Sequence, residues 1–140
     1  MTKIPMLSHV SVGVANVGRA KAFYDAVLGT LGYRRLMGGS YGHAWGISFP
    51  AFWAQKPFNG KRPTTGNGVH VCFNAKNKAA VDAFYTTALK RGGRCDGPPG
   101  LRIDYTANYY AAFVKDPDGN KIEALCFLSK KEMRTLKSAA

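Results

Sequence analysis

Apolar and polar residues alternate along two short stretches of the chain, residues 9–14 and residues 69–74. This two-residue period is typical of half-buried β-strands. Because successive side chains of a strand point to opposite faces, the valines of each stretch should share one face. His9 and His70 then fall on the other face of their strands.

Each predicted strand is followed by apolar residues at helical spacing, at residues 17–31 and 79–89. The apolar sides of these helices would cover the valine faces of the strands. Asn16 and Asn77 stand where an N-cap would accept hydrogen bonds from first-turn amides, and glycine follows both segments, where a C-cap belongs. The order strand, cap, helix and glycine therefore occurs twice.

The two stretches belong to an internal repeat, since residues 9–32 align with residues 70–93 without a gap. The match includes the leading His-Val pair and an Ala-Phe-Tyr triplet, Ala22-Phe23-Tyr24 and Ala83-Phe84-Tyr85. We predict three further strands after each helix, at residues 32–37, 44–49 and 51–56, and at residues 94–96, 109–115 and 121–127.

The repeat predicts an α+β fold of two βαβββ modules, related by a pseudo-two-fold axis and with their sheets facing a shared cavity. Module one would span about residues 5–60 and module two about residues 67–128, followed by a basic helical tail at residues 129–140. The 140 residues are 46% hydrophobic and 20% charged, which is ordinary globular usage. We therefore expect a single domain over residues 1–140.

Cysteine usage and hydropathy bear on the location of the protein. The amino-terminal segment lacks the continuous apolar run of a signal peptide, and no run approaches the length of a membrane span. Cys72, Cys95 and Cys126 are far apart and form no CxxC pair, which favours reduced thiols. We expect a cytoplasmic protein with no membrane partner.

The formal net charge of +12 raises the question of a nucleic-acid partner. The basic residues are scattered along the chain, and the densest patch lies in the tail at Lys130, Lys131, Arg134 and Lys137. No nucleic-acid recognition motif accompanies it. We predict no nucleic-acid partner, and a basic surface that favours an anionic small-molecule substrate.

The pseudo-two-fold axis predicts a metal site. His9 and His70 are equivalent residues on the non-valine faces and should converge, and Glu123 on the last predicted strand can face the same space. Two imidazoles and one carboxylate suit Zn²⁺, Mn²⁺, Ni²⁺ or Fe²⁺ and leave positions open for substrate oxygens. The alternative is that each histidine is simply hydrogen-bonded within a polar sheet face.

Residues 116–123, Asp-Pro-Asp-Gly-Asn-Lys-Ile-Glu, resemble the closing hairpin of the vicinal-oxygen-chelate (glyoxalase/bleomycin resistance protein/dioxygenase) superfamily. The resemblance covers nearly the whole chain and is nearest to short glyoxalase-like bacterial members. It implies that His9, His70 and Glu123 are metal ligands. It also implies that modules pair either within one chain or across a swapped dimer, and we expect a homodimer.

One position departs from this resemblance. Enzymes similar to glyoxalase I take a fourth ligand, usually Glu, from the last strand of module one. That strand here, residues 51–55, contains no carboxylate or histidine, and Gln55 is a displaced substitute. The chain thus resembles the three-ligand thiol transferases and extradiol dioxygenases, or the bleomycin-binding members that have no metal.

Aromatic and polar residues are predicted to line the pocket around the metal. We predict that Arg102 binds an anionic substrate group bidentately, unless it lies on the surface of its loop. The other predicted substrate-binding residues are Tyr41, Trp45, Trp53 and Asn108, and the predicted proton-transfer residues are Tyr105, Tyr110 and His43. For the tyrosines, packing within a sheet is the alternative.

Two functions remain open from the sequence. The first is a metal-dependent lyase, thiol transferase or dioxygenase, in which a divalent ion binds two adjacent substrate oxygens. The second is a metal-free protein that sequesters an aromatic or anionic small molecule between its sheets.

Overall fold

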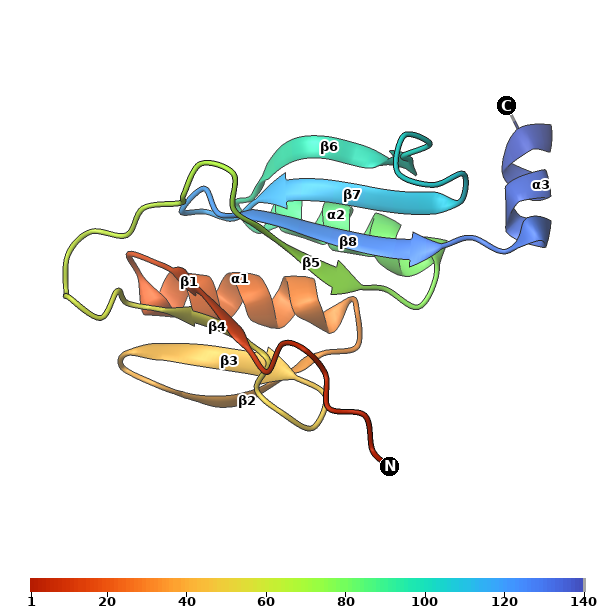
Figure 1. The fold of residues 1–140 in the computed structure, drawn as a ribbon. Coiled ribbons are helices and arrows are strands. Elements are labelled where there is room, and N and C mark those ends of the chain that lie inside the picture. The colour runs from red at the N-terminus through yellow and green to blue at the C-terminus, as the bar shows by residue number, and fades with distance from the viewer. Residues whose placement is uncertain (140) are drawn as a thin grey trace.

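The computed structural model describes residues 1–139. The predicted order of two βαβββ modules and a carboxy-terminal helix is present (Figure 1). Module one contains β1 (Val10–Gly13), α1 (Val17–Gly29), β2 (Arg34–Gly39), β3 (Gly42–Gly46) and β4 (Phe52–Gln55). Module two contains β5 (His70–Asn74), α2 (Lys78–Lys90), β6 (Arg94–Leu101), β7 (Tyr109–Lys115) and β8 (Lys121–Phe127), and is followed by α3 (Lys130–Ser138).

Each module forms its own four-stranded mixed sheet, with strand orders β1-β4-β3-β2 and β5-β8-β7-β6. The first strand of each module runs parallel to the last, and the other pairs are antiparallel. In these parallel pairs Ser11 is opposite Trp53 and Cys72 is opposite Glu123. Ser11 and Cys72 are equivalent in the repeat, so Trp53 occupies in module one the position that Glu123 occupies in module two.

One face of each sheet is covered by helix and the other is open. Figure 1 shows α1 and α2 behind the two sheets, with the edge strands β1 and β5 in the middle of the molecule. The side chains of Phe52 and Phe73 meet edge to face across this junction, with ring centroids 5.0 Å apart. Both open faces therefore lie on the side of the molecule that carries no helix.

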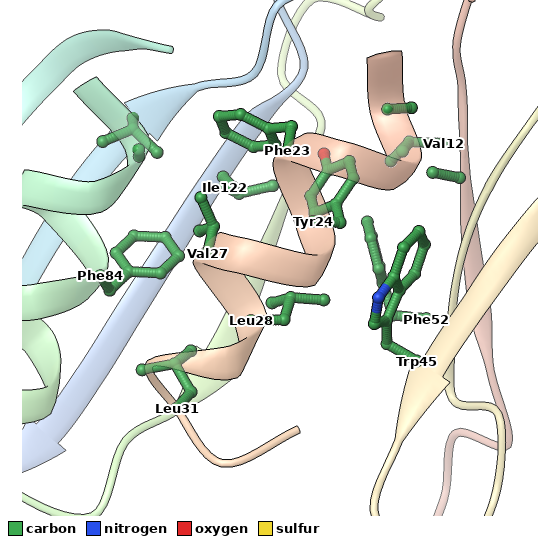
Figure 2. Close-up of a cluster of buried hydrophobic side chains, with 14 of the residues drawn as sticks. Val12, Phe23, Tyr24, Val27, Leu28, Leu31, Trp45, Phe52, Phe84 and Ile122 are labelled. Atoms are coloured by element: carbon green, nitrogen blue, oxygen red, sulfur yellow. The ribbon is translucent and has the colours of Figure 1, made fainter. Parts of the chain in front are cut away.

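Helix α1 lies at the centre of the main core. In Figure 2, Tyr24 and Leu28 of α1 lie on the side of Trp45 and Phe52, whereas Val27 faces Phe84 of module two. The valine faces pack against this core, because Val12 and Val14 are buried in it and Val10 and Val71 contact it, whereas Val69, which precedes β5, is exposed. Burial of this continuous apolar surface joins the two modules.

The Asp116–Asn120 hairpin is a second connection between the modules. Gly119 has φ +97°, a conformation that favours glycine. The buried Asp116 carboxylate accepts hydrogen bonds from the Asn120 backbone amide and from the Tyr24 hydroxyl of module one, the latter at 2.6 Å. Asn120 Nδ2 also donates to the Gly13 carbonyl oxygen at 2.9 Å. This motif fixes the position of one module against the other.

The predicted N-caps are present, whereas the C-caps are Thr30 and Arg91 rather than glycine, and several element bounds differ from the prediction. The Asn16 and Asn77 side chains accept hydrogen bonds from the amides of Arg19 and Ala80, which confirms both N-caps. Strand β6 continues beyond its predicted end, through the two prolines at residues 98–99, because an edge strand tolerates residues without an N–H donor.

The carboxy-terminal helix is held by local and tertiary contacts. Ser129 and Glu132 form a capping box at the start of α3, and Met133 and Leu136 pack against the smaller core of module two. Across residues 1–139, no helix combines the length and the hydropathy needed to cross a bilayer.

Candidate functional site

The open face of module two brings together the most distinctive polar cluster. His70 begins β5, and Glu123 lies on the neighbouring strand β8, with His70 Nε2 3.1 Å from Glu123 Oε2. Glu123 is only 1% exposed. The Tyr109 hydroxyl of β7 donates to Glu123 Oε1 at 2.5 Å. The buried carboxylate is thus hydrogen-bonded on both oxygens, as such a group requires.

Two neighbours of Glu123 keep their protons at neutral pH. Burial, with the adjacent Glu123 carboxylate as the next contribution, raises the pKa of the Cys72 thiol to about 12. Burial and the hydrogen bond to Glu123 also raise the pKa of the Tyr109 hydroxyl well above its ordinary value. Cys72 is therefore a thiol rather than a nucleophilic thiolate, and Tyr109 is a proton-bearing donor.

His9 lies in a separate hollow on the open face of module one. This hollow measures about 350 Å³, and its lining also includes Ser11, Tyr41, Phe49, Pro50, Trp53 and Gln55. The Trp53 and Tyr41 rings stack with centroids 6.1 Å apart. Tyr41, Trp53 and Gln55 therefore lie near His9, and the lining of this hollow contains no carboxylate.

A single chain does not assemble the predicted ligand set. Among residues 1–139, no group of three His, Cys, Asp or Glu side chains lies close enough together to hold a metal ion. His70 and Glu123 meet, whereas His9 belongs to the other hollow. The expectation that both histidines share one cavity within the chain is thus not met, and the three-ligand site stays a prediction.

The His70–Glu123 pair fits a divalent ion as two of its donors. Imidazole nitrogen and carboxylate oxygen match the preferences of the borderline transition metals. The two donor atoms lie at the same place on an open face, and Tyr109 orients the carboxylate through its second oxygen. A third protein donor has to come from outside this cluster.

Trp45 and His43 lie on the helix-covered face rather than in the hollow that contains His9, and their predicted roles toward a substrate stay predictions. Trp45 is 1% exposed in the core and donates from Nε1 to Asp25 at 2.9 Å. His43 lies next to it, with ring centroids 6.3 Å apart. Burial, followed by the charge of Arg35, lowers the pKa of His43. The two residues have the same strand parity, as predicted, but their shared face is the one that packs against α1.

Tyr110 and Asn108 also make contacts away from Glu123, and their predicted roles stay predictions. Tyr110 points toward α2, where its hydroxyl donates to Asp82 at 2.6 Å. Asn108 Nδ2 donates to the Leu128 carbonyl oxygen and so holds the chain after β8. The sequence analysis missed Tyr109, which alternates with Tyr110 and therefore faces the cluster.

Arg102 and Tyr105 do lie beside the open face of module two. The Arg102 guanidinium is centred 5.5 Å from the ring of Phe113, and the same ring lies 6.3 Å from that of His70. The exposed Tyr105 packs edge to face on Tyr109, with centroids 5.1 Å apart. Both residues are positioned at the rim of the cluster, and their roles toward a substrate stay predictions.

Comparison with known proteins identifies the family to which this fold belongs. A model of the Glyoxalase/Bleomycin resistance protein/Dioxygenase superfamily matches residues 6–124. The chain belongs to this superfamily. A glyoxalase/bleomycin resistance protein from Albidiferax ferrireducens T118 is 39% identical, with a TM-score of 0.81 over 86% of this chain and 98% of that chain.

More distant structures are similar as well. A putative glyoxalase from Bacillus halodurans is 26% identical, with a TM-score of 0.62 over 86% of this chain and 94% of that chain. A lactoylglutathione lyase from Agrobacterium tumefaciens, at 19% identity, shares the fold, with a TM-score of 0.63 over 88% of this chain and 94% of that chain. Among curated proteins, none matches this sequence significantly.

Within the superfamily fold, the strand register explains the departure noted in the sequence. The position equivalent to Glu123 in module one is Trp53, whose Nε1 donates to the Pro50 carbonyl oxygen at 3.1 Å. An indole offers no metal-binding lone pair. Module one of this superfamily member therefore contributes an aromatic wall where module two contributes a carboxylate.

Proposed function

We propose that this superfamily member is a metal-dependent enzyme acting on a small molecule, with its site assembled between two copies of the chain. His70 and Glu123 of one copy and His9 of the other would hold a divalent ion. The observation that carries the proposal is the 3.1 Å pairing of His70 and Glu123 on an open face, together with the placement of His9 in another hollow.

Exposed aromatic side chains support a homodimer. Tyr41 and Phe49 of module one, and Tyr105 and Phe127 of module two, are each at least half exposed. They lie around the hollow that contains His9 and around the Glu123 cluster, as their contacts with Trp53 and Tyr109 indicate. Burial of such apolar surface is favourable and stabilises an association. A second copy, placing its module one against this module two, would cover it.

Different residues around the ion would have different roles. Bound Zn²⁺, Mn²⁺, Ni²⁺ or Fe²⁺ would supply Lewis-acid chemistry toward two adjacent substrate oxygens. Tyr109 holds Glu123 in place, Trp53 and Tyr41 provide an aromatic wall, and Arg102 binds an anionic substrate group. Tyr105 is the remaining proton-transfer residue at the rim. The reaction that we propose is that of a lyase, a thiol transferase or a dioxygenase.

The cysteines support a cytoplasmic location for this activity. All three are free, and Cys95 is exposed. Exposed unpaired thiols persist in reducing compartments.

Subunit complementation tests the proposal. His9→Ala and His70→Ala variants should each lose the metal, measured by elemental analysis after loading with Zn²⁺ and desalting. Unfolded together and refolded, they should regain about a quarter of the parental metal content, because half of randomly formed dimers are mixed and each mixed dimer contains one intact site.

A matched pair provides the control. His70→Ala mixed with Glu123→Gln should regain nothing, because both residues come from the same chain in each site. Recovery of metal in this control would contradict a site in which His9 comes from one copy and His70 and Glu123 come from the other. No recovery of metal in the mixture of His9→Ala and His70→Ala would contradict it as well. Failure of the parent itself to bind any of the four ions at micromolar concentration would remove the metal-dependent function.

The second candidate is metal-free binding of an aromatic or anionic molecule. The observation favouring it is that Glu123 already has hydrogen-bonding partners on both oxygens and Trp53 replaces a ligand. In that case an aromatic anion should quench the fluorescence of Trp53 in the presence of a chelator. The quenching should persist in Trp45→Phe, where Trp53 is the remaining tryptophan. It should be lost when Trp53→Phe is added.

A further inference from the structure

A row of basic residues crosses the whole sheet of module two at one level. The strand register places His70 opposite Lys121, Lys121 opposite Lys115, and Lys115 opposite Arg94. Residues directly opposite one another on neighbouring strands have side chains on the same face, about 4.5–5.5 Å apart at Cβ. Like charges in such pairs are destabilising. The sheet therefore places Lys121, Lys115 and Arg94 side by side, although an acidic residue at one of these positions would be more stable.

The acidic residues within the structure offset only part of this charge. Lys121 forms an ion pair with Asp96 at 3.1 Å, and its ammonium also lies 5.0 Å from the centre of the Phe113 ring. Within residues 1–139, no ion pair involves Lys115 or Arg94. Two positive charges of the row are thus without a carboxylate partner in the part of the chain that the structure describes.

The same row borders a polar hollow of about 530 Å³. Its lining includes His70, Lys115, Lys121 and Asp96, and the remainder comes from residues 65–69 and Gly119. The hollow is large enough for a small oxyanion with its water shell. His70 connects it directly to the Glu123 cluster, because the imidazole belongs to both.

We propose that this hollow is a subsite for a phosphate-like anion, a second charged group of the small molecule that the protein binds. Lys115 is the main specificity-determining residue, since its ammonium has no carboxylate partner within residues 1–139, whereas Lys121 shares its charge with Asp96, which also lines the hollow. Neighbouring strands are separated by about 5 Å, which places Lys115 about 10 Å from the backbone of His70. The ligand is then a compact phosphate or phosphonate whose other end reaches the His70–Glu123 pair. The contact of the ligand with the His70–Glu123 pair rests on the proposed function, whereas the oxyanion subsite itself requires no metal.

Thermal unfolding in the presence of a chelator tests the subsite with inorganic phosphate as the probe. Sodium phosphate and sodium chloride are compared at equal ionic strength, on the parent and on Lys115→Gln. Phosphate should raise the Tm of the parent beyond the effect of chloride. Lys115→Gln should bind phosphate at least about tenfold more weakly, because a charged partner is lost. In dilute chloride the same variant should melt above the parent, because cross-strand repulsion is relieved.

The exposed Lys131 of α3 provides the matched control, and Lys131→Gln should keep the parental response to phosphate. A higher Tm of Lys115→Gln in chloride, together with a loss of its response to phosphate, would exclude general destabilisation as the cause of that loss. An equal response of the parent to phosphate and chloride would overturn the proposal, as would an unchanged phosphate affinity in Lys115→Gln.

Glu123→Gln separates the subsite from the metal site. It should lose Zn²⁺ binding and keep the phosphate response, which would support the subsite. Loss of the phosphate response in Glu123→Gln would overturn the subsite as an independent site. If the parent binds no metal but shows phosphate binding that depends on Lys115, the proposed function fails and the subsite stands.

Discussion

Tyr109 and Tyr110 are neighbours in the sequence but lie on opposite faces of β7. Tyr109 donates to the buried Glu123, whereas Tyr110 donates to Asp82 of α2. The alternation of side chains predicts this difference once the register is known, because Tyr110 is opposite Cys126 on β8. Cys126 shares its face with the apolar Ile122, so the sequence contained the signal that would have selected Tyr109.

Removing the Tyr109 hydroxyl should destabilise the protein. Tyr109→Phe leaves Glu123 Oε1 buried without its donor, at a cost of roughly 1–3 kcal/mol in the free energy of unfolding. Urea denaturation of the metal-free protein measures this change. Tyr105→Phe is the control, because Tyr105 is exposed and its hydroxyl makes no hydrogen bond within the described chain. An equal effect of both substitutions would show that the Glu123 contact contributes nothing to stability.

His43 should make the stability of the protein depend on pH. Its pKa is lowered by burial and by Arg35 and Lys21, so the unfolded chain takes up a proton more readily than the folded one. The stabilising contribution is complete above about pH 6.5 and is lost as the pH falls from there through the folded value. NMR titration of the imidazole should give a midpoint below 6.5. The unfolding free energy of His43→Gln should fall less between pH 7.5 and 5.5 than that of the parent.

At the scale of elements, the repeat predicted most of the structure. The two strand-helix units, both asparagine caps and the closing hairpin follow from local patterns, because each depends on residues near one another in the sequence. The bounds of β2, β3 and β6 were less accurate. These strands have irregular register at Met37 and Gly97, and side-chain periodicity does not reveal such shifts.

The hairpin at Asp116–Asn120 is the element whose side chains should matter most for stability. Asn120→Ala removes donors from the Gly13 carbonyl and from the Asp116 carboxylate, which should lower the free energy of unfolding by roughly 2–3 kcal/mol. Chemical denaturation monitored by tryptophan fluorescence measures this. Asn59→Ala is the comparison: Asn59 accepts one exposed hydrogen bond from the Lys61 amide, and its loss should cost less than about 1 kcal/mol.

At the scale of the whole molecule, the sequence predicted which residues share a face but not how the modules are placed. Strand parity correctly assigned His9 and His70 to the open faces, and it correctly placed Glu123 beside His70. The distance between His9 and His70 depends on packing of α1 against α2 and on contacts such as Phe52 with Phe73. These contacts have no local periodicity, so the separation of the two histidines could not be derived from the pattern.

Placing a charge on the open face should dissociate the proposed dimer. Phe127→Asp introduces a carboxylate at an exposed aromatic that packs on Tyr109, and burial of that charge would oppose association. Light scattering coupled to size-exclusion chromatography should show a monomer that keeps its fold. Leu89→Asp, at an exposed position of α2 on the helix-covered side, should remain dimeric. Dissociation by Leu89→Asp alone would place the interface on the other side of the protein.

The contacts of the closing hairpin have a consequence for biosynthesis. Tyr24 acquires its carboxylate partner only when Asp116, 92 residues later, has left the ribosome, and the core around α1 also requires Val114 and Ile122. A nascent chain that contains only the first half would expose this apolar surface to chaperones and to other nascent chains. The two halves still share an evident pattern of residues, yet they have become mutually dependent. Expressed alone, either half would lack the neighbours that its sequence now requires.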